Sequence, residues 1–140
     1  MNGDFMGVQL TKDSIDLGIV IRDADKSLAF YRDTLGFVDA GSNPMPGGGG
    51  TMYRLMCGTS LIKLIHPGSE PPASAPPGGI PGAYGYRYWT ITVSNLAEIT
   101  DACAAAGARV VVPVREIRGG ISISIVEDPD GNWVEFLQAG

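Results

Sequence analysis

Apolar and polar positions alternate along the first predicted strand, residues 15–21. Successive side chains of a strand point to opposite faces, so one face here is wholly aliphatic. Its members are Ile15, Leu17, Ile19 and Ile21. Asp16, Gly18 and Val20 fall on the other face. The pattern predicts a strand with one face on a core.

A helical pattern follows directly. Asp23 or Asp25 can cap a helix, and Gly36 suits its C-terminal end. Its apolar positions recur at helical spacing and are Ala24, Leu28, Tyr31 and Leu35. A Pro/Gly loop at 43–50 then precedes two strands at 51–57 and 60–66, with room for a short strand at 37–40.

The pattern restarts after residues 67–85, a Pro/Gly-rich stretch without periodicity that we interpret as a linker or lid. Residues 88–93 alternate as a strand. Asn95 and Glu98 are spaced as a capping box, which predicts a helix that Gly107 ends. Three further strands are predicted at 109–114, 121–126 and 133–137.

The two halves have the form of an internal repeat. Asp16 aligns with Tyr88 and Lys63 with Glu135 at the same offset of 72 residues. We therefore expect one domain, residues 1–140, with a first module at 14–66, the linker at 67–85 and a second module at 86–138.

Two motifs resemble the vicinal oxygen chelate superfamily of glyoxalases, bleomycin-resistance proteins and dioxygenases. The segment 15–37 (IDLGIVIRD, then SLAFYRDTLGF) is similar to the opening of such a domain, and 127–136 (EDPDGNWVEF) is similar to its closing hairpin. The resemblance implies an α+β fold of two βαβββ modules, whose curved mixed sheets surround a shared cleft, in a homodimer or a fused pair.

The resemblance also implies a four-residue site, with one side chain from the first and last strand of each module. These positions carry Asp16, Lys63, Tyr88 and Glu135, which we take as the candidate catalytic residues. Strand alternation places all four opposite the residues predicted to face the helices. Those residues are Ile19, Leu64, Ile91 and Phe136.

The family holds a divalent metal at these positions, but this donor set is poor. A lysine ammonium has no lone pair and a neutral phenol is a weak ligand. We predict that the protein has no metal cofactor; a divalent ion, if bound, would lie near Asp16 and Glu135. Lys63 is expected to stand between the two carboxylates as the cation of a charge triad. That triad fits an ion-paired core and a proton-transfer site equally.

Further ligand-binding candidates come from the neighbouring strands. Either Arg54 and Met56 or Tyr53 and Leu55 face the cleft, depending on a register that the sequence leaves open. On the second module we expect the cleft to be lined by Thr90, Ser122, Ser124 and Trp133.

Net charge and composition limit the classes of partner that the sequence predicts. The formal net charge is −5, and no basic cluster favours nucleic acid or an anionic membrane surface. No apolar run is long enough to span a bilayer, and the two cysteines suggest neither a disulfide framework nor a zinc site, so we expect a cytoplasmic protein. We expect a homodimer because exposed sheet edges are commonly covered by pairing.

Two functions remain in competition. The first is a metal-independent isomerase or lyase that transfers protons on an oxygenated organic substrate. The second is a protein that sequesters a drug or metabolite without catalysis. An enzyme of this kind needs the polar centre intact, whereas a sequestering protein needs aromatic side chains in the cleft. Metal-dependent glyoxalase or dioxygenase chemistry is disfavoured by Lys63 and Tyr88.

Overall fold

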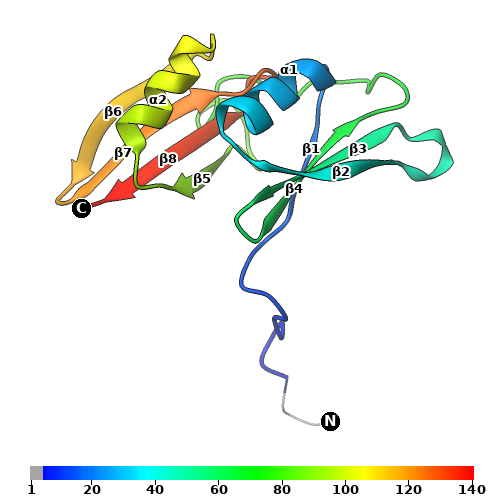
Figure 1. The fold of residues 1–140 in the computed structure, drawn as a ribbon, viewed down its shortest axis with the longest axis horizontal. Helices are drawn as coiled ribbons and strands as arrows, with labels where there is room; N and C mark the ends of the chain where they lie inside the picture. Colours follow the sequence, from blue (N-terminus) through cyan, green and yellow to red (C-terminus); the bar gives the residue numbers. More distant parts are fainter. Residues whose placement is uncertain (1–4) are drawn as a thin grey trace.

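The chain forms two four-stranded mixed sheets, in a computed structural model that describes residues 5–140. The first sheet has the order β1-β4-β3-β2 and the second β5-β8-β7-β6 (Figure 1). The strands of the first are β1 (Leu17–Val20), β2 (Val38–Pro44), β3 (Thr51–Cys57) and β4 (Ser60–His66). Those of the second are β5 (Tyr88–Thr92), β6 (Val110–Arg118), β7 (Ile121–Glu127) and β8 (Trp133–Ala139). The predicted α+β class and two-module fold are confirmed.

The strand register repeats between the sheets. In each sheet the first strand pairs in parallel with the last, and all other pairs are antiparallel. Gly18 is the partner of Lys63, and Thr90, at the equivalent position of the second sheet, is the partner of Glu135. The 72-residue offset in the sequence thus reflects equivalent strand positions.

The first helix begins as predicted but changes its winding. The Asp23 side chain caps α1 (Ala24–Leu28) by accepting a 3.0 Å hydrogen bond from the Lys26 backbone N–H. The helix then continues as a π-helix, η1 (Ala29–Thr34), in which the Leu35 N–H donates to the Phe30 carbonyl. β2 extends further than the short strand expected at 37–40, and the predicted loop contains a 3-10 turn, η2 (Pro46–Gly48).

The second helix, α2 (Leu96–Ala105), is not capped as its sequence suggested. The Asn95 side chain donates to the Glu98 carboxylate, at 2.8 Å, and makes no bond to the helix backbone. Gln138 of β8 takes over instead, because its side-chain oxygen accepts from the Leu96 N–H at 2.8 Å. A long-range partner therefore replaces the expected local cap.

The helices lie on the same side of the two sheets (Figure 1), and one core joins the modules. Tyr31 of η1 is fully buried, with its ring 6.2 Å from that of Trp89 in β5. Its hydroxyl donates a 2.6 Å hydrogen bond to Asp128, which follows β7. The opposite faces of the sheets are therefore left without helices.

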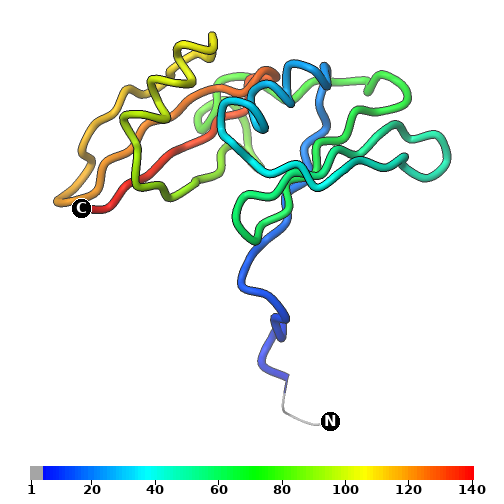
Figure 2. Tube along the Cα trace, viewed as in Figure 1, coloured from blue at the N-terminus to red at the C-terminus, as the bar shows by residue number. Residues whose placement is uncertain are grey.

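From Phe5 onward, the chain before β1 projects away from both sheets (Figure 2). Phe5, Met6 and Val8 there are each more than four-fifths exposed. In residues 5–140 there is no helix of the length and apolarity needed to cross a membrane.

Residues 67–85, which we call the strap, cross from β4 to β5 as turns and irregular chain. Arg87 anchors it by donating to the carbonyls of Gly79, at 2.6 Å, and Pro76, at 2.8 Å. Gly79 is buried against the Trp133 indole, so closely that an added Cβ would lie 2.1 Å from a ring atom. Only glycine fits this contact, which fixes the strap to the second sheet.

Gly79→Ala should detach the strap. The overlap with Trp133 is expected to lower the free energy of unfolding by about 1–3 kcal/mol more than Gly58→Ala does. Gly58 is a matched control, because its φ of +59° strains alanine in the same way as the +58° of Gly79, while its Cβ would meet nothing within 4 Å. Urea unfolding and limited proteolysis measure the difference; equal stability and equal cleavage of the strap would contradict the contact.

Candidate functional site

Each sheet has a helix face, which packs on the core, and an open face on its other side. On the first sheet Leu17, Ile19, Ile62 and Leu64 belong to the core. Partners in register share a face, so Gly18, Lys63 and Arg54 form one row across β1, β4 and β3 on the open face. This settles the register that the sequence left open: Arg54 and Met56 share the face of Lys63, while Tyr53 and Leu55 belong to the core side.

Asp16 lies just before β1 and is held by two donors. Lys12 Nζ approaches its carboxylate at 2.6 Å and the Leu61 backbone N–H donates to it at 3.2 Å. The hydrogen bond from Lys12, followed by that from Leu61, lowers the pKa of Asp16 below its ordinary value. Asp16, which lies on the same face as Lys63, is therefore already paired with Lys12.

Glu135 and Tyr88 share the open face of the second sheet. Thr90 is the register partner of Glu135, and its hydroxyl donates a 2.6 Å hydrogen bond to Glu135 Oε1. Tyr88, two residues earlier on β5, is 48% exposed. The side chain of Glu135 thus has one oxygen oriented by Thr90.

The expected triad of Asp16, Lys63 and Glu135 is not formed within the chain. In the part of the chain that the structure describes, neither Lys63 nor Glu135 has an ion-pair partner within 4.0 Å. The physical reason is that Lys12 neutralises Asp16 locally, and that the two sheets carry the candidate residues on separate open faces.

The residues do not fit the family's divalent metal. Among residues 5–140 no group of three or more histidine, cysteine or acidic side chains is placed to hold an ion. Lys63 offers no lone pair when charged, and Asp16 already accepts two hydrogen bonds.

The expectation for Ser122 and Ser124 is wrong. Ser124 pairs in register with Phe136, is fully buried, and lies 2.7 Å from the Thr100 hydroxyl of α2. Ser122 pairs with Gln138, whose side chain caps α2, and so shares the helix face. The alternation of polar and apolar residues predicted that these serines lie on the polar face. It could not show that Thr100 of α2 provides a hydrogen-bond partner for the buried hydroxyl of Ser124.

Thr90 and Trp133 lie on the open-face side of the second sheet, in different surroundings. Thr90 holds Glu135. Trp133 donates from its indole N–H to Glu127 at 3.2 Å and is covered by Gly79 of the strap.

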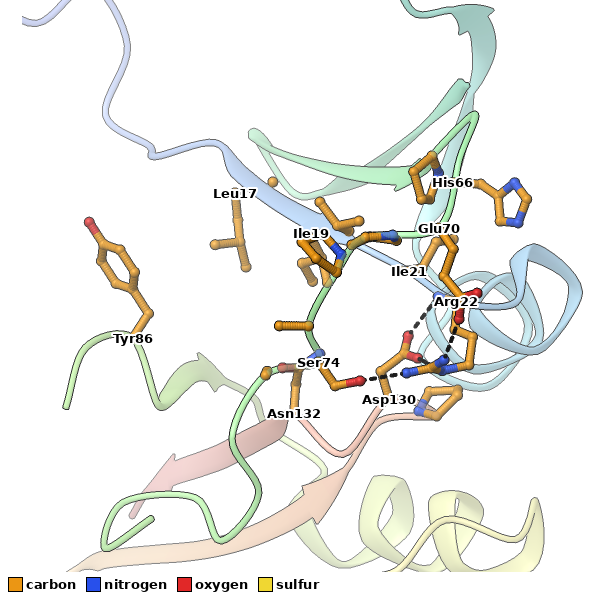
Figure 3. Close-up of a pocket in the computed structure, with 18 of the residues that line it drawn as sticks. Leu17, Ile19, Ile21, Arg22, His66, Glu70, Ser74, Tyr86, Asp130 and Asn132 are labelled. Carbon is orange, nitrogen blue, oxygen red and sulfur yellow. Dashed lines mark hydrogen bonds and ion pairs between the residues drawn. The ribbon is translucent and has the colours of Figure 1, made fainter. Parts of the chain in front are cut away.

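A groove of about 1070 Å³ lies between β1 and β5, the edge strands of the two sheets (Figure 3). Leu17, Ile19 and Tyr86 line its apolar part. At one end Arg22 donates to the Ser74 hydroxyl at 2.8 Å and lies 3.7 Å from Glu70 and 4.0 Å from Asp130. Sequence reasoning missed Arg22, because its partners come from the strap and from the β7–β8 turn.

The comparisons with known proteins agree with this architecture. Residues 14–136 match the model of the Glyoxalase/Bleomycin resistance protein/Dioxygenase superfamily. No curated protein matches the chain.

Three solved structures illustrate the likeness. SMU.1112c is 25% identical, with a TM-score of 0.74 over 91% of this chain and 99% of its own. The glyoxalase family protein APC24694 of Bacillus cereus is 16% identical, with a TM-score of 0.80 over 96% and 98%. The trypanothione-dependent glyoxalase I of Leishmania major is 22% identical, with a TM-score of 0.69 over 91% and 87%. The last two show the fold alone.

The two sheets repeat the same strand order, with a parallel pair at one edge of each. Together with the match over residues 14–136, this shows that the chain belongs to the glyoxalase/bleomycin resistance protein/dioxygenase superfamily.

Proposed function

We propose that the protein is a homodimeric enzyme that moves a proton on a small oxygenated substrate, with Glu135 as the base. The observation that carries this proposal is the 2.6 Å hydrogen bond from Thr90 to Glu135 Oε1. It fixes the carboxylate on an open face and leaves its second oxygen to accept a proton, as a general base requires.

The proposed reaction, of a class that the family resemblance suggests, uses two groups on that face. Glu135 takes a proton from a carbon next to a carbonyl, and the electron pair moves to the carbonyl oxygen to give an enolate. The Tyr88 hydroxyl, on the same open face, would donate a hydrogen bond to that oxyanion. Return of the proton to a different atom gives an isomer, and return to the same carbon from solvent gives isotope exchange.

A second copy is part of the proposal. β1 and β5 are unpaired on their outer edges and flank one groove, and Val20 on β1 is 56% exposed. Covering such edges is a common reason for dimerisation, and a twofold axis makes the contact reciprocal. Pairing β1 of one copy with β5 of the other would place Asp16 and Lys63 opposite Tyr88 and Glu135 of the partner subunit. A cytoplasmic location remains our expectation from composition.

Sequestration of an aromatic compound is the second candidate. It is favoured by Tyr86, which is fully exposed, and by Tyr88 and Trp133, all of which line the groove. Such side chains stack on planar ligands. Binding without proton exchange would select this alternative.

The role of Glu135 as the base is tested by the exchange of a carbon-bound hydrogen for deuterium. Dihydroxyacetone in D₂O should exchange its carbon-bound hydrogen faster with the protein than in buffer, and Glu135→Gln should reduce the protein-dependent rate at least about 100-fold, as loss of a general base does. Proton NMR follows the exchange. Glu98→Gln, the same change on an exposed residue of α2, is the control and should leave the rate unchanged. Equal rates for wild type and Glu135→Gln would contradict the assignment, as would the absence of any protein-dependent exchange.

The dimer is tested with Val20→Lys. A charge on the exposed apolar edge of β1 should convert the dimer to a monomer in light scattering at micromolar concentration. Val38→Lys serves as the control, because Val38 is 66% exposed on β2, the far edge of the same sheet, and its replacement should leave the dimer intact. A monomeric wild type would refute the dimer. If Val20→Lys stayed as dimeric as Val38→Lys, the contact would have to lie elsewhere.

A further inference from the structure

The open face of the first sheet carries two cations side by side. Arg54 on β3 and Lys63 on β4 are register partners in an antiparallel pair, and both side chains are half-buried. Like charges in such positions repel each other, because directly opposed Cβ atoms lie about 5 Å apart. In a chain with a net charge of −5, this is an unexpected concentration of positive charge.

Among the residues that the structure describes, no carboxylate is in direct contact with either cation, since none lies within 4.0 Å of either head group. Asp16 lies on this face, but its ion pair is with Lys12, at 2.6 Å; the hydrogen bond from Lys12 is the main cause of its lowered pKa, and the more distant charge of Lys63 contributes least. The two positive charges are therefore available to a ligand.

The backbone positions Arg54. β2 bulges between Asp39 and Ser42, where the Asp39 carboxylate accepts from the Gly41 N–H at 2.7 Å. The bulge leaves the Ala40 carbonyl free of the strand ladder, and Arg54 donates to it at 3.1 Å. A guanidinium has five N–H donors, so most of them stay free for another partner.

Most side chains beside the row of Gly18, Lys63 and Arg54 are apolar, so this face combines a charged centre with apolar surroundings. Gly18 continues the row from Lys63 onto β1, and a Cβ added there would meet nothing within 4 Å. The row on one side is apolar, with Val20, Ile65 and Met52, and the row on the other side has Leu61 and Met56, with Asp16 beside Leu61. A charged head could bind in the row while a hydrocarbon part covers the apolar neighbours.

We propose that Arg54 and Lys63 together bind the carboxylate of a small organic acid whose apolar part lies over the flanking rows. This deepens and rests on the proposed function, because it names the substrate class of the same cleft. A carboxylate matches the planar guanidinium and gives charge-assisted hydrogen bonds to both cations. Occupation also relieves the repulsion between the two positive side chains.

Fluorine NMR titration with 4-fluorobenzoate and its neutral isostere 4-fluorobenzamide tests the proposal. At constant ionic strength the carboxylate should bind about 10-fold more tightly than the amide. Arg54→Gln and Lys63→Gln should each weaken carboxylate binding about 5- to 10-fold while leaving amide binding unchanged, which also shows that the variants are folded. The double variant Arg54→Lys/Lys63→Arg keeps both charges and should retain most of the preference.

Lys26→Gln is the matched control, since it removes the same charge from an exposed residue of α1, and it should change neither affinity. Equal binding of the two probes, no binding of the carboxylate, or an affinity insensitive to both substitutions would overturn the proposal. The exchange of dihydroxyacetone, a neutral molecule, is independent of this preference. Loss of the preference with exchange intact rejects only the carboxylate site, whereas carboxylate binding without exchange rejects only the base.

Discussion

The hydrogen bond between Tyr31 and Asp128 is the contact on which the arrangement of the two modules depends. Tyr31 belongs to the first module and is fully buried; Asp128, 5% exposed, follows the third strand of the second. Asp128 also accepts from the backbone N–H groups of Asp130 and Asn132, each at 2.9 Å. One carboxylate thus orders the turn before β8 and joins it to the first module.

This bond has consequences for the site. The aromatic cluster around Tyr31 brings the helix faces together, with Phe37 at 6.0 Å and Trp89 at 6.2 Å between ring centroids. The open faces then carry Lys63 on one sheet and Glu135 on the other, with β1 and β5 as unpaired edges. The proposed second copy would bring these faces together, and the proposed carboxylate would neutralise the cations of the first sheet.

The sequence predicts the fold well where short-range patterns decide it. β3 and β4 have the predicted bounds, and the repeat of the two halves appears in the strand register. It fails where partners are distant. Gln138 caps α2 from 42 residues away. Thr100 hydrogen-bonds Ser124 from 24 residues away. A local contact was missed as well, because Lys12, four residues before Asp16, takes the carboxylate that Lys63 was expected to pair with. Strand alternation predicts on which face of the sheet a side chain lies, but not which residue of another element contacts it.

The buried hydroxyl of Tyr31 joins the two modules through Asp128, and stability at alkaline pH tests this role. Burial, and then the negative charge of Asp128, raise the pKa of Tyr31 well above its ordinary value. The folded state therefore keeps this proton where the unfolded chain, with a tyrosine pKa of about 10, releases it, and folding stability must fall as pH rises above that value. Urea unfolding should show wild type more stable than Tyr31→Phe by about 1–3 kcal/mol at pH 8, since the substitution leaves a buried acceptor with one donor fewer. That advantage should shrink steadily above about pH 10. Equal stability at pH 8 and parallel curves at alkaline pH would contradict the account.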